Sequence, residues 1–150
     1  YYLAYGSNLN VKQMKSRCPD ARVLGTGEIE GYRLLFKGSK TGYYLTIEKQ
    51  EGSRVPVAVW EASEADELRL DRYEGYPVFY YKTEMPITFR GCQTGRKRTR
   101  NAFVYIMHEE NLLGIPTMRY METCLEGYRF FGFDEKILRK ALNDSWEGLL

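Results

Sequence analysis

Residues 1–10 read YYLAYGSNLN, and in this stretch a predicted strand runs directly into a turn and then a helix. Residues 2–5 favour a strand, residues 6–8 (Gly-Ser-Asn) favour a turn, and Asn10 is placed to cap a short helix. Glycine lets a backbone approach a ligand closely, and the N–H groups at a helix start have no partner inside the helix. The stretch is therefore suited to hold a carboxylate or a developing oxyanion, although a plain strand–turn–helix connection also explains it.

Length and composition indicate one ordinary globular domain over residues 1–150. Hydrophobic residues make up 43% of the chain and charged residues 28%, and no apolar run approaches the length of a membrane span. The net charge of +2 gives no general reason to expect nucleic acid or a membrane surface as a partner. Three cysteines without CxxC spacing fit a reducing compartment, so we expect a cytoplasmic protein. No targeting segment is visible, and the lack of an initial Met is consistent with removal of an initiator or a short leader.

The order of the predicted elements indicates an α+β fold. Strands separated by Gly-containing turns are expected at residues 2–5, 22–29, 32–36, 43–48, 55–60, 79–85, 87–89 and 102–107. Helices are expected after the N-caps Asn10, Ser63, Thr117 and Asp134. Their buried faces are expected to hold, in chain order, Val11, Met14 and Cys18; Ala65, Leu68 and Tyr73; Met118, Met121, Leu125 and Tyr128; and Ile137, Leu138, Ala141 and Leu142. Because strands mostly precede helices, we expect an antiparallel or mixed sheet.

Most familiar site chemistries find no support in the sequence. His108 is the single histidine and ends a predicted strand, so a zinc site or a Ser–His–Asp or Cys–His arrangement has no good candidate. GxSxG, GxGxxG and GxxxxGK[ST] motifs are absent. We therefore expect no metal and no cofactor. The basic stretch Arg90–Arg100 (RGCQTGRKRTR) leaves nucleic-acid binding as a remote alternative to a solvated hairpin tip.

Glu74 stands out because it lies where a helix would normally carry a cation. It precedes Gly75 at the predicted end of the helix that begins after Ser63, and Tyr73 and Tyr76 flank it. The negative end of the helix dipole and desolvation by aromatic rings both raise the pKa of a carboxyl group above its reference of about 4.3. Such a group can accept and return a proton, whereas an exposed Glu at a frayed helix end would keep its ordinary pKa.

An ordered set of motifs spans nearly the whole chain. YGSN follows the first strand, VAVWEAS leads into a helix that ends LDRYEGYP, and Tyr80 and the strand AFVYIM come next. PTMRYMETCLEG forms a weaker C-terminal match. Together these motifs resemble the γ-glutamylcyclotransferase family, including its AIG2-like relatives. The resemblance implies a small β-barrel-like α+β domain, with a mixed or antiparallel sheet, flanking helices and a pocket at one mouth.

The resemblance also implies roles for individual residues. Glu74 would be the general acid/base. The residues expected to bind a small-molecule γ-glutamyl substrate, through the backbone N–H groups of the first loop and through the pocket wall, are Tyr5, Gly6, Ser7, Asn8, Leu9, Tyr80, Tyr81 and Tyr105. The chain is one residue shorter after Glu74 than the animal enzyme, so either Tyr80 or Tyr81 could hold one of these positions.

The implied activity is cyclisation of a γ-glutamyl amine or γ-glutamyl amino acid to 5-oxoproline with release of the free amine. The α-amino nitrogen attacks the γ-carbonyl of the same molecule, so correct positioning supplies a large share of the rate. An alternative is a domain of the same fold that binds a small ligand without turning it over. Relatives suggest that a homodimer is possible.

Overall fold

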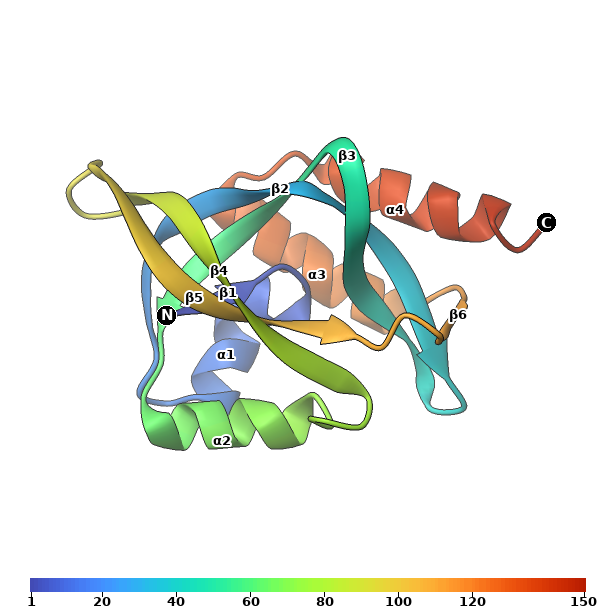
Figure 1. Ribbon diagram of the computed structural model, residues 1–150, viewed down its shortest axis with the longest axis horizontal. Coiled ribbons are helices and arrows are strands. Elements are labelled where there is room, and N and C mark those ends of the chain that lie inside the picture. Colours follow the sequence, from blue (N-terminus) through green and yellow to red (C-terminus); the bar gives the residue numbers. More distant parts are fainter.

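A computed structural model describes residues 1–150, the Ser39 side chain excepted, and shows a β-sheet that closes on itself (Figure 1). The described strands are β1 (Tyr2–Ala4), β2 (Arg22–Ser39), β3 (Gly42–Glu61), β4 (Tyr80–Gly91), β5 (Lys97–Met107) and β6 (Leu112–Leu113). Their order is β3-β1-β5-β4-β2-β6, and β3 also pairs with β2, so five of these strands close a barrel and β6 extends it. The α+β class and the barrel-like mixed sheet are thus confirmed.

The first strand lies inside the sheet, between β3 and β5. Leu3 pairs with Val59 in an antiparallel sense, and Tyr2 pairs with Phe103 in a parallel sense. All residues of β1 are buried. The loop that follows β1 therefore leaves from the interior of the sheet, where strands from distant parts of the chain meet.

The strands β2 to β4 are longer than predicted. Each of these strands combines two ranges that were expected to be separate strands, so this expectation was wrong. The combined ranges are 22–29 with 32–36, 43–48 with 55–60, and 79–85 with 87–89. Gly31 (φ +79°) and Gly52 (φ +83°) take backbone conformations that bend β2 and β3 without ending them, and the β2–β3 register shifts beside Gly31. Pro86 is tolerated within β4 because the strand pairs only with β5 at that position.

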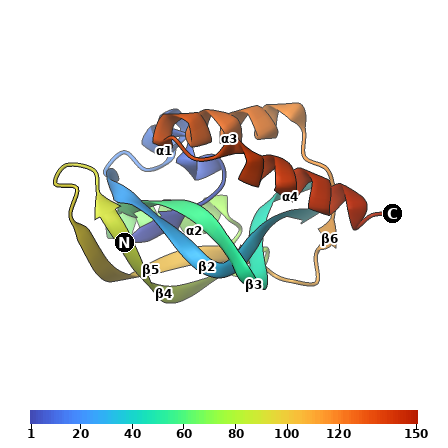
Figure 2. The ribbon, with the colours of Figure 1, turned by 90° about the horizontal axis from the view of Figure 1, so that it is seen from above.

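Four α-helices and a short 3-10 turn accompany the barrel in the described chain. They are η1 (Ser7–Leu9), α1 (Val11–Arg17), α2 (Glu64–Tyr73), α3 (Met118–Phe131) and α4 (Glu135–Glu147). The predicted N-caps are confirmed, because Asn10, Ser63, Thr117 and Asp134 each accept a hydrogen bond from a backbone N–H in the first turn. Figure 2 shows α3 and α4 together on one side of the barrel, and Figure 1 shows α2 along its lower edge.

The buried helix faces agree with the prediction in α1 and α4, agree in α3 except at its first residue, and differ in α2. Ala65, Leu68 and Tyr73 in α2 and Met118 in α3, which were expected to be buried, are exposed. Met121, Leu125 and Tyr128 of α3 lie in or against the core, as expected. The buried residues that were not expected are Asp66 and Leu70 in α2, and Cys124 and Gly127 in α3. Helix α3 is oriented so that Gly127 lies against Leu9 of η1, where a side chain would not fit. Helix α2 buries the capping residue Asp66 in place of the expected apolar face.

The cap of α2 holds the helix that carries Glu74. Asp66 is fully buried, accepts the Ser63 N–H at 3.4 Å and accepts a hydrogen bond from Arg69 at 2.8 Å, while the Ser63 hydroxyl accepts the Asp66 N–H at 3.1 Å. Asp66→Ala is expected to lower the free energy of unfolding by about 1–2 kcal/mol, because the Ser63 N–H and the Arg69 guanidinium both lose their acceptor. Urea unfolding measures the effect, with Glu64→Ala in the same helical turn as control. Equal midpoints for the two variants would contradict the prediction.

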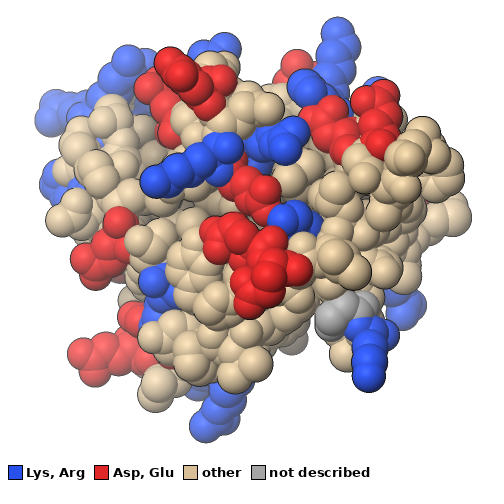
Figure 3. All heavy atoms as spheres, turned by 45° about the vertical axis from the view of Figure 1, so that its right-hand side comes forward, with Lys and Arg blue, Asp and Glu red and all other residues tan. Residues whose placement is uncertain are grey.

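The surface carries charges of both signs. On the face in Figure 3, acidic and basic groups lie side by side. The stretch 90–100 spans the exposed turn between β4 and β5, which agrees with a solvated hairpin tip. Among the described residues, no helix combines the length and the apolar character needed to cross a membrane.

Candidate active site

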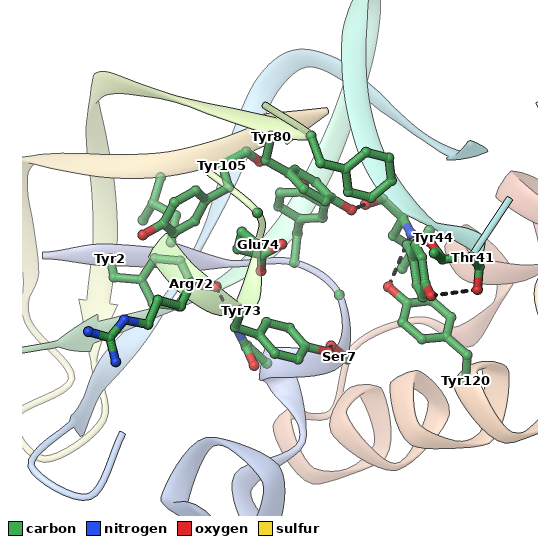
Figure 4. A pocket seen from close by; sticks show the side chains of 17 residues that line it. Tyr2, Ser7, Thr41, Tyr44, Arg72, Tyr73, Glu74, Tyr80, Tyr105 and Tyr120 are labelled. Atoms are coloured by element: carbon green, nitrogen blue, oxygen red, sulfur yellow. Dashed lines mark hydrogen bonds between the residues drawn. The ribbon is translucent and has the colours of Figure 1, made fainter. Parts of the chain in front are cut away.

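A cavity of about 260 Å³ lies between the loop after β1, the end of α2 and the turn that joins β2 to β3 (Figure 4). Aromatic residues from several elements line it, among them Tyr2, Tyr5, Tyr73, Tyr80, Tyr105 and Tyr120. Its wall also holds two charged residues of the described chain, Arg72 and Glu74, and Arg72 points away from the centre (Figure 4). The cavity thus offers a small, largely aromatic space that contains one carboxylate.

Glu74 is the C-cap of α2, and its side chain projects into the cavity (Figure 4). Its backbone N–H donates to the Leu70 carbonyl at 2.8 Å, and Gly75 (φ +64°) then turns the chain away from the helix. The carboxylate is partly buried and has no hydrogen-bond or ion-pair partner among the described residues. A ligand in the cavity would therefore meet a free carboxylate.

Burial raises the pKa of Glu74 from its ordinary value of 4.5 to about 7, against the positive charge of Arg17, which lowers it. Burial also raises the pKa of Tyr80 and Tyr120 well above the usual range, and the nearby Glu74 charge adds to this effect. These phenols stay neutral at physiological pH. Glu74 is consequently suited to exchange protons near neutrality.

The raised pKa predicts that Glu74 destabilises the folded protein as the pH rises. Between pH 4.5 and about 7, the folded protein keeps a proton on Glu74 that the unfolded chain has lost. Over this interval the unfolding free energy of the wild type should fall relative to that of Glu74→Gln, by about 1.4 kcal/mol per unit of pKa difference. Urea titrations of both proteins at about pH 5 and about pH 8 measure it. A stability difference that does not change with pH would contradict the prediction.

The loop after β1 contributes Gly6, Ser7 and Asn8 to the cavity wall. Within η1, Leu9 and Asn10 donate their N–H groups, each at 3.0 Å, to the carbonyls of Gly6 and Ser7. The N–H groups of Gly6, Ser7 and Asn8 have no acceptor among the described residues. These three donors are available to an anionic group of a ligand.

Gly6 keeps the loop close to its neighbours. A β-carbon at this position would lie 3.3 Å from the Tyr120 hydroxyl and 3.5 Å from the Leu45 β-carbon. The Tyr120 hydroxyl in turn accepts the Leu45 N–H at 3.1 Å, which fixes the ring. A larger residue at position 6 would therefore push against a wall that is itself held in place.

Most residues predicted for the site meet in the cavity. Glu74 lines it together with Tyr5, Gly6, Ser7, Asn8, Tyr80 and Tyr105. Leu9 does not line it, because the side chain is fully buried and its N–H is used within η1. Tyr81 also lies outside, since successive residues of a strand point to opposite faces, and its hydroxyl donates to Glu109 at 2.6 Å. Tyr80 is therefore the tyrosine of this pair that faces the cavity.

The hydroxyl groups of three wall tyrosines are engaged with the protein. Tyr80 donates to the Leu45 carbonyl at 2.8 Å, and Tyr5 donates to the backbone carbonyl of Tyr105 at 2.7 Å. Tyr105 donates to Asp71 at 2.6 Å. These residues therefore offer a ligand their rings, while Glu74 offers an uncommitted polar group.

Sequence reasoning missed part of the wall. Tyr44 comes from β3, Phe79 from the segment before β4 and Tyr120 from α3. The Tyr44 ring centroid lies 6.2 Å from that of Phe79 and 5.3 Å from that of Tyr120. Tyr44 lies in a predicted strand and Tyr120 follows a predicted cap, but no local pattern indicates that they meet.

The structure thus combines a small barrel with a cavity that holds a carboxylate of raised pKa, beside a loop in which the N–H groups of residues 6–8 have no acceptor among the described residues. The family model described as "Gamma-glutamyl cyclotransferase, AIG2-like" matches residues 2–128. The chain belongs to this family, which confirms the resemblance of its motifs.

Solved structures share the fold. One described as a gamma-glutamyl cyclotransferase has a TM-score of 0.75 and 25% sequence identity, covering 93% of this chain and 84% of its own. An uncharacterized protein from Homo sapiens has a TM-score of 0.72 and 24% identity, with the same coverage of 93% and 84%. A yeast cyclotransferase described as specific to glutathione has a TM-score of 0.58 and 11% identity, covering 96% and 93%. A comparison with curated proteins finds no match.

Proposed function

We propose that the protein converts a γ-glutamyl amine or γ-glutamyl amino acid to 5-oxoproline and the free amine, with Glu74 as general acid and base. Membership of the family supports an activity of the γ-glutamyl cyclotransferase type. The observation that carries the proposal is the Glu74 carboxylate, which faces a small cavity, has no partner among the residues that the structure describes, and has its pKa raised to about 7 by burial. A general base works best when its pKa lies near the working pH.

The reaction requires little beyond positioning and proton transfer. The α-amino nitrogen attacks the γ-carbonyl carbon, a new C–N bond closes the five-membered ring, and the bond to the departing nitrogen breaks. The α-ammonium group gives up two protons, one before the attack and one from the tetrahedral intermediate. Ionised Glu74 accepts these protons and passes them to the departing nitrogen, so the products are the 5-oxoproline carboxylate and an ammonium ion. General acid–base catalysis of this kind contributes roughly 10²–10⁴-fold.

The loop and the aromatic wall would hold the substrate in a folded conformation. We assign its α-carboxylate to the N–H groups of Gly6, Ser7 and Asn8, because three unpaired donors match a permanent negative charge. The rings around Glu74 limit the space for an extended chain. Good alignment of attacking and attacked groups is worth an effective molarity of up to about 10⁵–10⁸ M, so this restraint would supply much of the rate.

The test is release of 5-oxoproline from a panel of γ-glutamyl amides by the purified protein, with the amine and glutamate also quantified. The panel should include γ-glutamyl amino acids, a γ-glutamyl-ε-lysine and simple γ-glutamyl alkylamides. N-acetylated versions serve as controls, because they lack the attacking amine. In H₂¹⁸O, cyclisation leaves 5-oxoproline unlabelled, whereas a hydrolase would give labelled glutamate. Absence of 5-oxoproline across the panel would overturn the proposal.

A further inference from the structure

Arg17 joins two elements of the cavity wall without lining the cavity itself. It is the last residue of α1 and is half-buried. One guanidinium nitrogen donates to the Ser7 hydroxyl at 3.3 Å and to the side-chain oxygen of Asn8, and the other donates to the Tyr73 hydroxyl. The guanidinium carbon lies 3.5 Å from the centre of the Tyr73 ring. The Arg17 side chain thus contacts both the loop after β1 and Tyr73, the last residue of α2, which directly precedes Glu74.

The hydrogen bonds of Arg17 continue across the cavity wall. Asn8 accepts from Arg17 through its side-chain oxygen and donates through its side-chain nitrogen to the Tyr2 hydroxyl at 2.9 Å. This path runs from α2 through α1 to β1 and fixes the orientation of the Asn8 amide. Ser7 is held from a second side, because its hydroxyl lies 3.4 Å from the Tyr73 hydroxyl.

We propose that Arg17 is a positioning residue, which fixes the N–H groups of Ser7 and Asn8 relative to Glu74 by bridging the loop after β1 to Tyr73. The inference rests on the proposed function, since it assigns Arg17 to the alignment of the substrate with the acid/base. A guanidinium suits this position because it forks between two acceptors while stacking on an aromatic ring. A lysine ammonium supplies the charge but neither the fork nor the stacking.

The positive charge of Arg17 also favours the ionised form of Glu74. It therefore lowers the pKa of Glu74, whereas burial raises it. The other titratable groups that face Glu74 are tyrosines, from β1, the loop after it, α2, β4, β5 and α3: Tyr2, Tyr5, Tyr73, Tyr80, Tyr105 and Tyr120. Burial raises the pKa of each, so they stay neutral while Glu74 titrates. Arg72, the remaining charged residue in the described wall, points outward (Figure 4).

The experiment compares Arg17→Gln and Arg17→Lys with Lys15→Gln, which removes the same charge from an exposed position on the same helix. The pKa of Glu74 is measured by carboxyl ¹³C NMR, with Glu74→Gln to assign the signal, and kcat and KM are measured with the γ-glutamyl amide that the wild type cyclises fastest. We expect Arg17→Gln to raise the pKa of Glu74 and to raise KM by roughly 10–100-fold, since charge-assisted hydrogen bonds are lost. Arg17→Lys should keep the pKa near the wild-type value but still raise KM, and Lys15→Gln should change neither.

Two results would overturn the inference. The first is an Arg17→Gln variant whose Glu74 pKa and KM equal those of the wild type. The second is an equal loss of activity in both Arg17 variants with a lowered melting temperature and no change of pKa, which would show a purely structural role. If the wild type releases no 5-oxoproline, the proposed function fails separately. The carboxyl titration and the amide shifts of residues 6–8 then still decide whether Arg17 couples the loop to Glu74.

Discussion

Replacing Glu74 with Gln is expected to lower the rate of 5-oxoproline release by roughly 10²–10⁴-fold, the usual contribution of a general acid/base. Gln has nearly the shape of Glu but neither accepts nor returns a proton. The Glu74 carboxylate has no partner in the described structure, so the substitution deprives no other protein group of a hydrogen bond. The measurement is the initial rate of 5-oxoproline formation at saturating substrate, with circular dichroism to verify the fold.

Glu64→Gln is the matched control, because it changes an exposed Glu at the opposite end of α2. It should keep the wild-type rate. Wild-type turnover by Glu74→Gln would show that another group moves the protons. A different pattern, in which wild type and Glu74→Gln bind γ-glutamyl ligands equally and neither releases product, would identify a binding domain of the same fold.

Gly127→Val is expected to lower the free energy of unfolding by about 1–3 kcal/mol and to raise KM. A β-carbon at residue 127 would lie 2.5 Å from the Leu9 β-carbon and 2.6 Å from the Leu9 carbonyl carbon. Both atoms belong to a buried segment that cannot yield without moving η1. Because η1 carries the N–H groups of Ser7 and Asn8, its displacement should weaken substrate binding as well as stability.

Urea unfolding and steady-state kinetics measure the two effects of Gly127→Val. Glu122→Ala provides a control on the same helix at an exposed position, where a substitution usually changes stability by no more than about 0.5 kcal/mol. A Gly127→Val protein with the stability and KM of the wild type would show that α3 does not hold the loop.

Local sequence signals predict where elements begin and what caps them. Asn10, Ser63, Thr117 and Asp134 each act within their own first helical turn, so neighbouring residues suffice to identify them. The positions of the long strands are also predictable, because runs of β-favouring residues are local signals. The bends at Gly31 and Gly52 are not, because a glycine between two apolar runs looks the same whether it ends a strand or curves it. Only the pairing of β2 with β3 distinguishes the two cases.

The candidate site is likewise only partly predictable from local sequence. The position of Glu74 at a helix end beside aromatic residues is visible in the sequence, and so is the small-residue turn at residues 6–8. Tyr44, Tyr120 and Arg17 reach the site from separate elements, and their meeting depends on how those elements pack. The rotation of α3, which sets Tyr120, follows from the fit of Gly127 against Leu9, a contact between residues far apart in the chain.

The placement of β1 sets a requirement on protein synthesis. Tyr2 pairs with Trp60 on one side and with Phe103 on the other, so the first strand has no complete set of neighbours until β5 has left the ribosome. Pairings between strands so far apart in the sequence form slowly, and apolar segments stay exposed to solvent until they have formed. A nascent or truncated chain that lacks β5 therefore contains every residue of the loop after β1 but cannot hold this loop in its native position. The site is expected to form only after β5 has been synthesised.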